Sequence, residues 1–226
     1  MSSEADGNLA SVSPTGPLLP SFPVWGLFGR SLLYVLGQIL VIPAPWTATG
    51  YHRFICEQVA LPDGRRLRFS GQPGDIWYVF IGLAVLGWLH NVQHAGVGGA
   101  VTLATILLTF PVLRWFCGNV RTDDGQLKLS FDGEVLAWLG WNILLVVSLL
   151  TVIGWAWVLR AMMQWICRKT TGTVRFTFTA TGLSILGHAL LLVVICVFII
   201  PIPWAMRWYA DWFARQFSVV SPNAAG

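Results

Sequence analysis

Two stretches of the chain repeat each other closely: Ile42-Pro43-Ala44-Pro45-Trp46 near the N-terminus and Ile200-Pro201-Ile202-Pro203-Trp204 near the C-terminus. Each follows a long apolar run, and a third version, Ile153-Gly154-Trp155-Ala156-Trp157, follows another such run. Proline interrupts a helix, and tryptophan collects at the boundary between membrane and water. The repetition predicts a chain built from similar units, each with an apolar helix that ends at a Pro/Gly-Trp break.

The residues after the break repeat as well. An arginine follows the second tryptophan by three residues and another tryptophan follows it by eight, which gives Arg160 and Trp165 in one copy and Arg207 and Trp212 in another. In the first copy Thr49 stands in place of the arginine, and a further, degenerate copy ends at residues 110–115. This pattern predicts a short helix rich in aromatic and basic residues directly after each break.

The amino-acid composition indicates whether the protein folds in water or in lipid. The 226 residues are 55% hydrophobic and 11% charged, with a mean hydropathy of +0.66, whereas a soluble domain carries about 25% charged residues. The apolar residues form blocks at 24–42, 76–116 (broken at 90–96), 135–159 and 183–202. A helix crossing the bilayer needs roughly 20 such residues. We therefore expect an α-helical polytopic protein of the bacterial inner membrane with about five hydrophobic helices.

Short segments between the blocks alternate polar and apolar residues, which is typical of β-strands. They lie at 65–70, 126–131 and 173–179, each after a turn and each followed by a glycine: Gly71, Gly133 and Gly182. Since open strand edges cannot face lipid, these strands are predicted outside the hydrocarbon and paired with each other. About four units result, the last stopping before its strand, with a disordered tail at 1–22, one membrane domain at 23–217 and a C-terminal tail at 218–226.

The distribution of basic residues leaves two topologies open. Basic residues follow every apolar block, so single crossings would place alternate clusters on opposite sides, against the positive-inside tendency. In the alternative, the helix after each break turns back into the membrane as a hairpin, and all strands gather on one face.

Part of the repeat resembles the YjgN-like family of bacterial inner-membrane proteins of unknown function. The segment Thr151-Val152-Ile153-Gly154-Trp155-Ala156-Trp157-Val158-Leu159-Arg160 is similar to the family's central motif, and Pro203-Trp204-Ala205-Met206-Arg207 to a second copy of it. The strand exits Phe69-Ser70-Gly71 and Phe131-Asp132-Gly133-Glu134 also resemble the family pattern. The resemblance covers residues 69–217 and implies the repeated membrane architecture, but it implies no activity.

The candidate site residues are of three kinds. Lipid head-group contacts are expected at the repeated Arg and Trp positions, which are Arg114, Arg160, Arg207, Trp46, Trp157, Trp204, Trp165 and Trp212. In the alternative, the arginines bind an anionic ligand in a pocket or pair with Asp75, Glu134 or Asp211. Intramembrane polar roles are assigned to His188 and Asn142. His90 and His94 form a weak metal-like pair, and Cys56, Cys117, Cys167 and Cys196 are interpreted as small packing residues.

These features favour a membrane subunit or scaffold, because the spanning segments hold so few charged residues, and a non-enzymatic one, because no catalytic motif occurs in the chain. The alternative is a transporter of a small solute or lipid, with a pocket between the repeats lined by His188, Asn142 and the repeat arginines. No cofactor is predicted. The expected partners are membrane lipids and other membrane-protein subunits or further copies of the chain, and the small net charge of +4 argues against nucleic acid.

Overall fold

Four units of strand, helix, helix and strand make up the protein, as seen in a computed structural model that describes residues 15–91, 98–151 and 153–220. The first unit is β2 (Leu19–Pro20), α1 (Val24–Leu40), α2 (Ala44–Glu57) and β3 (Val59–Ala60), and the second is β4 (Leu67–Phe69), α3 (Trp77–Asn91), α4 (Gly98–Asn119) and β5 (Val120–Thr122). The third is β6 (Leu129–Phe131), α5 (Val135–Ser148) with a 3-10 turn at Leu149–Thr151, α6 (Trp155–Lys169) and β7 (Thr170–Gly172). The fourth is β8 (Arg175–Phe178), α7 (Gly182–Cys196), α8 (Ile202–Arg215) and β9 (Phe217–Val220), and β1 (Gly16–Pro17) precedes the first unit.

In every unit the strand before the helices pairs antiparallel with the strand after them. One backbone hydrogen bond closes all four units in the same way: the residue after the first strand donates its N–H to the last residue before the return strand. These bonds are Ser21 to Gln58 (2.8 Å), Ser70 to Asn119 (2.9 Å), Asp132 to Lys169 (2.9 Å) and Thr179 to Gln216 (2.9 Å). The shared bond identifies equivalent positions in the four units. It also shows that each pair of helices forms a hairpin whose two ends meet at the strands.

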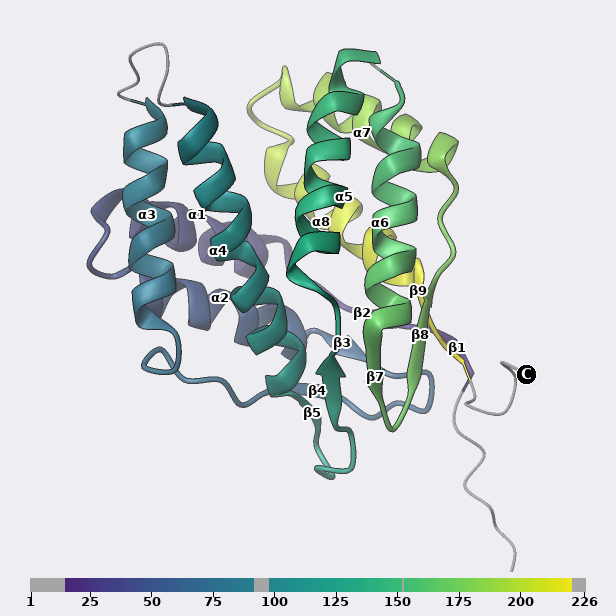
Figure 1. The fold of residues 1–226 in the computed structure, drawn as a ribbon. Helices are drawn as coiled ribbons and strands as arrows, with labels where there is room; N and C mark the ends of the chain where they lie inside the picture. Colours follow the sequence, from purple (N-terminus) through teal and green to yellow (C-terminus); the bar gives the residue numbers. More distant parts are fainter. Residues whose placement is uncertain (1–14, 92–97, 152, 221–226) are drawn as a thin grey trace, which may run out of the picture.

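The four hairpins form a closed ring. The first helix of each hairpin contacts the second helix of the preceding one, as α3 does with α2, α5 with α4 and α7 with α6, and α1 closes the ring against α8. Near the termini, β1 pairs with β9 and extends the β8–β9 pair to three strands. In Figure 1 the strands lie at the lower end of the molecule, and α3 and α5 run up to the opposite end.

The predicted strands are confirmed, whereas their predicted pairing with one another is wrong. The alternating segments correspond to β4, β6 and β8, but each pairs with a short strand that follows the second helix of its own unit. The last unit also ends in a strand, since β9 occupies Phe217–Val220 where the C-terminal tail was expected. At the other end, β1 and β2 lie within the segment predicted as a disordered tail. Strands of two to four residues have too few alternating positions to be recognised in the sequence, so these strands are not predicted.

The helices fall into the two predicted kinds. The apolar helices are α1, α3, α4, α5 and α7, and the aromatic-basic helices after the breaks are α2, α6 and α8. Of the described helices, only α4 has the length and composition to cross a membrane; the other apolar helices are shorter. Helices of fourteen to seventeen residues span about 21–26 Å, less than the hydrocarbon core of about 30 Å. Apart from α4, the described apolar helices are therefore shorter than a full crossing requires.

Proline and glycine act as the sequence predicts at the hairpin ends. Pro43 and Pro201 precede the first residues of α2 and α8, and Gly154 precedes α6. In the first hairpin the reversal is tight: Val41 has φ 63° and ψ −60°, and the Ile42 N–H bonds to the Leu40 carbonyl at 2.7 Å. This is a γ-turn centred on a β-branched residue, a rare and strained conformation.

Candidate functional site

A cavity of about 600 Å³ lies where the second helices of all four hairpins face one another, and we call it the axial cavity. Its walls are the last turns of α2, α4, α6 and α8, together with strand residues such as Leu67, Val120 and Leu129. The four second helices line it without packing closely on each other, because each packs instead on first helices. The ring therefore leaves an apolar space at its centre.

One position of the repeat contributes small side chains to this cavity. In each unit, the residue two positions before the one whose carbonyl accepts the closing hydrogen bond lines the cavity. These residues are Cys56, Cys117, Cys167 and Ala214. The three cysteines are free and buried. Their burial agrees with the expectation of small interior side chains, whereas Cys196, expected to behave in the same way, is exposed. Among the described residues, no three His, Cys, Asp or Glu side chains are arranged to hold a metal ion.

His52 of α2 also lines the axial cavity. Its ring lies within 5.4–6.3 Å of four aromatic side chains, between centroids: Phe69, Phe80, Trp115 and Phe116. Its Nδ1 forms a 2.7 Å hydrogen bond with the Ala48 carbonyl of its own helix. The imidazole is thus satisfied within α2 and enclosed by rings, as a packing residue would be.

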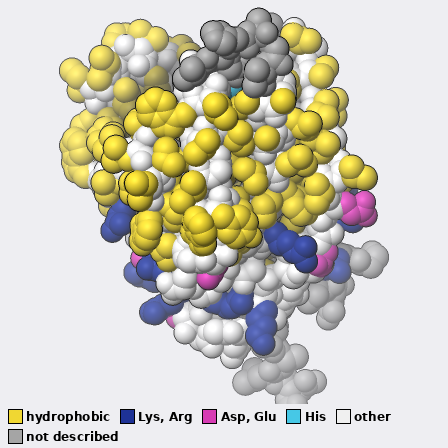
Figure 2. Space-filling model, turned by 60° about the vertical axis from the view of Figure 1, so that its left-hand side comes forward, with side chains coloured by type: hydrophobic (Ala, Val, Ile, Leu, Met, Phe, Trp, Pro, Cys, Tyr) yellow, Lys and Arg dark blue, Asp and Glu magenta, His cyan; other side chains and the backbone are white. Residues whose placement is uncertain are grey.

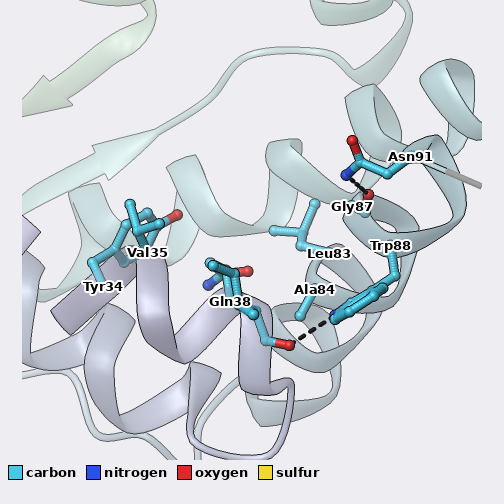
Figure 3. Close-up of a pocket in the computed structure, with 9 residues that line it drawn as sticks. Tyr34, Val35, Gln38, Leu83, Ala84, Gly87, Trp88 and Asn91 are labelled. Carbon is cyan, nitrogen blue, oxygen red and sulfur yellow. Dashed lines mark hydrogen bonds between the residues drawn. The ribbon is translucent and has the colours of Figure 1, made fainter. Parts of the chain in front are cut away.

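A second pocket, of about 460 Å³, lies between the first helices α1 and α3 (Figure 3). The indole of Trp88 donates a 2.7 Å hydrogen bond to the Ile39 carbonyl across the two helices, and the Asn91 amide bonds back to Gly87 at 2.9 Å. Gln38 also lines this pocket, and its buried side-chain nitrogen has no hydrogen-bond partner in the structure. The pocket lies on the outside of the ring, between neighbouring units.

The repeated tryptophans separate into an exposed and an inward-facing set. Trp46, Trp157 and Trp204 occupy the same position of their units and are 62%, 45% and 51% exposed. Trp165 is buried against Phe131, with ring centroids 5.7 Å apart, so its indole is not free to meet lipid as expected. Trp212 is partly buried at the corresponding position of α8.

The repeat arginines do not form one cluster. Arg160 and Arg207 are equivalent, whereas Arg114 falls four residues later in its unit and is exposed. Arg207 pairs with Asp211 at 3.4 Å, which is one of the pairings considered from sequence. Asp75 instead accepts a 2.9 Å hydrogen bond from the Trp115 indole. None of the three arginines lines either of the two pockets.

The intramembrane polar candidates bond within their own helices. His188 Nδ1 lies 2.8 Å from the Ser184 carbonyl, and its ring stacks on Trp212 with centroids 3.8 Å apart. The Asn142 amide donates to the Trp138 carbonyl at 2.8 Å, also within a single helix. Neither residue lines the described pockets. His90 lies in the last turn of α3, and His94 lies outside the described residues.

The sequence does contain a signal for the axial cavity, a tripeptide that recurs at one position of all four units. The tripeptides Phe54-Ile55-Cys56, Trp115-Phe116-Cys117, Trp165-Ile166-Cys167 and Trp212-Phe213-Ala214 stand at the same place in the four units. An alignment on the Pro/Gly-Trp breaks hides the second copy, because α4 continues without a break. Leu107 takes the place of the exposed tryptophan there.

No protein-family model, curated protein or solved structure matches this chain. The resemblance to the YjgN-like family therefore stays a prediction. What the fold and its pockets define is a closed ring of four helical hairpins, tied at one end by paired strands, around a central apolar cavity.

Proposed function

We propose that the protein is inserted in a bilayer by its four helical hairpins from one side and works there as a non-enzymatic membrane subunit or scaffold. The observation that carries the proposal is the separation of apolar and charged surface along the molecule. In Figure 2 hydrophobic side chains cover the helical upper part of the visible face, and Lys, Arg, Asp and Glu lie below them. A soluble protein rarely exposes an apolar surface of this extent.

The exposed apolar side chains lie on the elements that would meet lipid. Of the large hydrophobic residues that are exposed, all but Leu19 lie on helices or hairpin connections, and the most exposed include Leu150, Ile199 and Ile200 at the hairpin ends. In the sequence, α3, α5 and α7 carry no Lys, Arg, Asp or Glu, and α1 carries only Arg30. Lipid is the environment that stabilises such a surface.

Insertion as hairpins also resolves the conflict over basic residues. Since both strands of each unit pair with each other, every hairpin returns the chain to the strand side. The basic clusters that follow the second helices then all face the same compartment, in agreement with the positive-inside tendency. Ion pairs tie neighbouring turns together on that side, where Arg65 bonds to Asp124 at 2.9 Å and Arg68 pairs with Asp123.

Accessibility of single cysteines tests the insertion. In a Cys196→Ser background, whose remaining native cysteines are buried, Arg66→Cys, Gln126→Cys and Thr173→Cys place thiols in three exposed turns between units. Sealed vesicles of either orientation are treated with a membrane-impermeant maleimide. We expect all three thiols to react from the same side, and a Leu150→Cys control at a hairpin end not to react from that side.

Two results would contradict this proposal. Labelling of Gln126→Cys from the side opposite to the other two turns would indicate single crossings. Release of the protein from membranes by alkaline carbonate without detergent would indicate that it is not inserted at all. The scaffold role has its own test: the protein purified in mild detergent should retain a stoichiometric protein partner or further copies, and a pure monomer would remove the support for this role.

A second candidate function, the handling of lipid, is favoured by the axial cavity. The solute-transport version of this idea has no supporting pocket, since His188, Asn142 and the repeat arginines lie outside both described pockets. An apolar cavity instead suits an apolar molecule.

A further inference from the structure

The axial cavity is built for an apolar occupant. No charged side chain lines it, although residues from all four units take part. The thiols of Cys56, Cys117 and Cys167 and the methyl group of Ala214 keep the wall small at the same place in each unit. Larger side chains at this repeated position would fill the centre of the ring.

Water is a poor occupant of this cavity. A buried water needs two to four polar partners. The polar side chains that line the wall include His52 and Thr170, and both already bond to carbonyls of their own chain segments: His52 to Ala48 at 2.7 Å and Thr170 to Ile166 at 2.9 Å. Apart from the Tyr51 hydroxyl and the three thiols, the wall therefore offers few hydrogen-bonding side-chain groups.

An empty cavity is also unfavourable at this size. The loss of stability grows with the volume left unfilled. An engineered apolar cavity of about 150 Å³ already takes up benzene, and the axial cavity, at about 600 Å³, is several times larger. Its volume falls within the usual range of ligand pockets, about 300–1,000 Å³. An apolar molecule of suitable size therefore fits the centre of the ring.

We propose that the axial cavity binds one acyl chain of a membrane phospholipid. This inference rests on the proposed insertion in the bilayer, because the bilayer then supplies the chain. At the strand end, three basic residues are the direct sequence neighbours of lining residues: Arg121 follows Val120, Lys169 precedes Thr170 and Arg215 follows Ala214. These cations are complementary to a phosphate head group at the same end.

Native mass spectrometry of the protein purified in mild detergent tests the binding. The full-length chain is stripped of lipid and then mixed with vesicles of phosphatidylglycerol. We expect the wild type to retain one phospholipid per chain, and Ala214→Phe, which fills the cavity, to retain it about tenfold less. The matched control is Ala100→Phe, at an exposed site on α4, which should bind as the wild type does.

The native thiols give a second measurement that needs no variant. Cys117 and Cys167 line the cavity, whereas Cys196 is exposed. In the stripped protein a small apolar maleimide should modify the cavity thiols, and added phospholipid should slow that reaction without changing the rate at Cys196. This measurement decides the question even if Ala214→Phe does not fold.

The outcomes separate the two proposals. A membrane-inserted protein that retains no phospholipid overturns the acyl-chain site alone, and so does equal retention by Ala214→Phe and the wild type. Retention of a free fatty acid in place of phospholipid overturns the phospholipid as the source of the chain. A protein that carbonate releases from membranes overturns the proposed insertion, on which this inference rests.

Discussion

The ring of Phe69 meets the indole of Trp115 edge to face, with centroids 4.9 Å apart and an interplanar angle of 78°. Gly71 lies directly against this pair, because a Cβ added there would come within 2.5 Å of the Trp115 ring and 2.6 Å of the Phe69 ring. The third unit repeats the arrangement with Phe131, Gly133 and Trp165. The strand-exit glycine is thus required by the aromatic pair that joins a strand to the second helix of its unit.

Gly71→Ala is predicted to destabilise the protein. The added methyl group would force apart two packed rings, which costs about 1–3 kcal/mol in a well-packed core. Thermal unfolding in detergent, followed by circular dichroism, measures the effect. Gly118→Ala in α4 is the control, since a Cβ there meets nothing within 4 Å. An equal melting temperature for Gly71→Ala and the wild type would show that the glycine is not under this constraint.

The aromatic pair also shows how far sequence alone could lead. The pattern Phe-x-Gly at the strand exit and the tryptophan of the second helix were both visible, and the helix breaks at Pro43, Gly154 and Pro201 fell where they were expected. What sequence could not supply was which strand pairs with which. Strands of two to four residues carry too few alternating positions to be recognised without their partners.

The site was harder to predict than the fold. The residues that seemed chemically distinctive, such as His188 and Arg160, lie away from the described pockets. The axial cavity is instead formed by cysteines and aliphatic residues, which look like ordinary packing residues in a single helix. Their meaning appears only when equivalent positions of four units are placed around one axis.

A second close approach holds the first hairpin together. A Cβ added at Gly37 of α1 would overlap the side chain of Thr47 on α2. Small residues permit such contact between helices in a membrane environment. Gly37→Ala is therefore predicted to lower the melting temperature, whereas Gly29→Ala in the same helix, where a Cβ has nothing within 4 Å, should leave it unchanged or raise it. Equal effects of the two substitutions would contradict the close approach.

Charged residues on the strand side make the stability of the folded protein depend on pH in the acid range. The carboxylate of Asp124 accepts hydrogen bonds from the Thr122 hydroxyl, from Arg65 and from the Gln126 N–H, and these bonds lower the pKa of Asp124 to about 2. Because the pKa is lower in the folded protein than in the unfolded chain, the stabilisation is present above the ordinary pKa, about 3.9. It is lost as the pH falls from there towards 2.

Asp124→Asn removes this contribution. We expect the variant to melt below the wild type near neutral pH, with the difference shrinking as the pH approaches 2, where the wild-type carboxyl is protonated too. Melting curves of both proteins across this range measure it. Lys128→Gln, an exposed change on the same side of the molecule, serves as the control for general charge effects. A difference that persists unchanged at the lowest pH would assign the loss to something other than titration of Asp124.

At the turn centred on Val41, substitution by glycine is predicted to increase the stability of the protein. A β-branched residue is strained at φ 63°, whereas glycine adopts positive φ without a steric penalty. Val41→Gly relieves this strain, and its expected benefit is about 1 kcal/mol, reduced by the greater freedom of glycine in the unfolded chain. Val41→Ala separates the two contributions, because it removes the branching but keeps a Cβ. If Val41→Gly melts at a lower temperature than Val41→Ala, the apex of the first hairpin is not strained, and its tight reversal depends on the valine side chain instead.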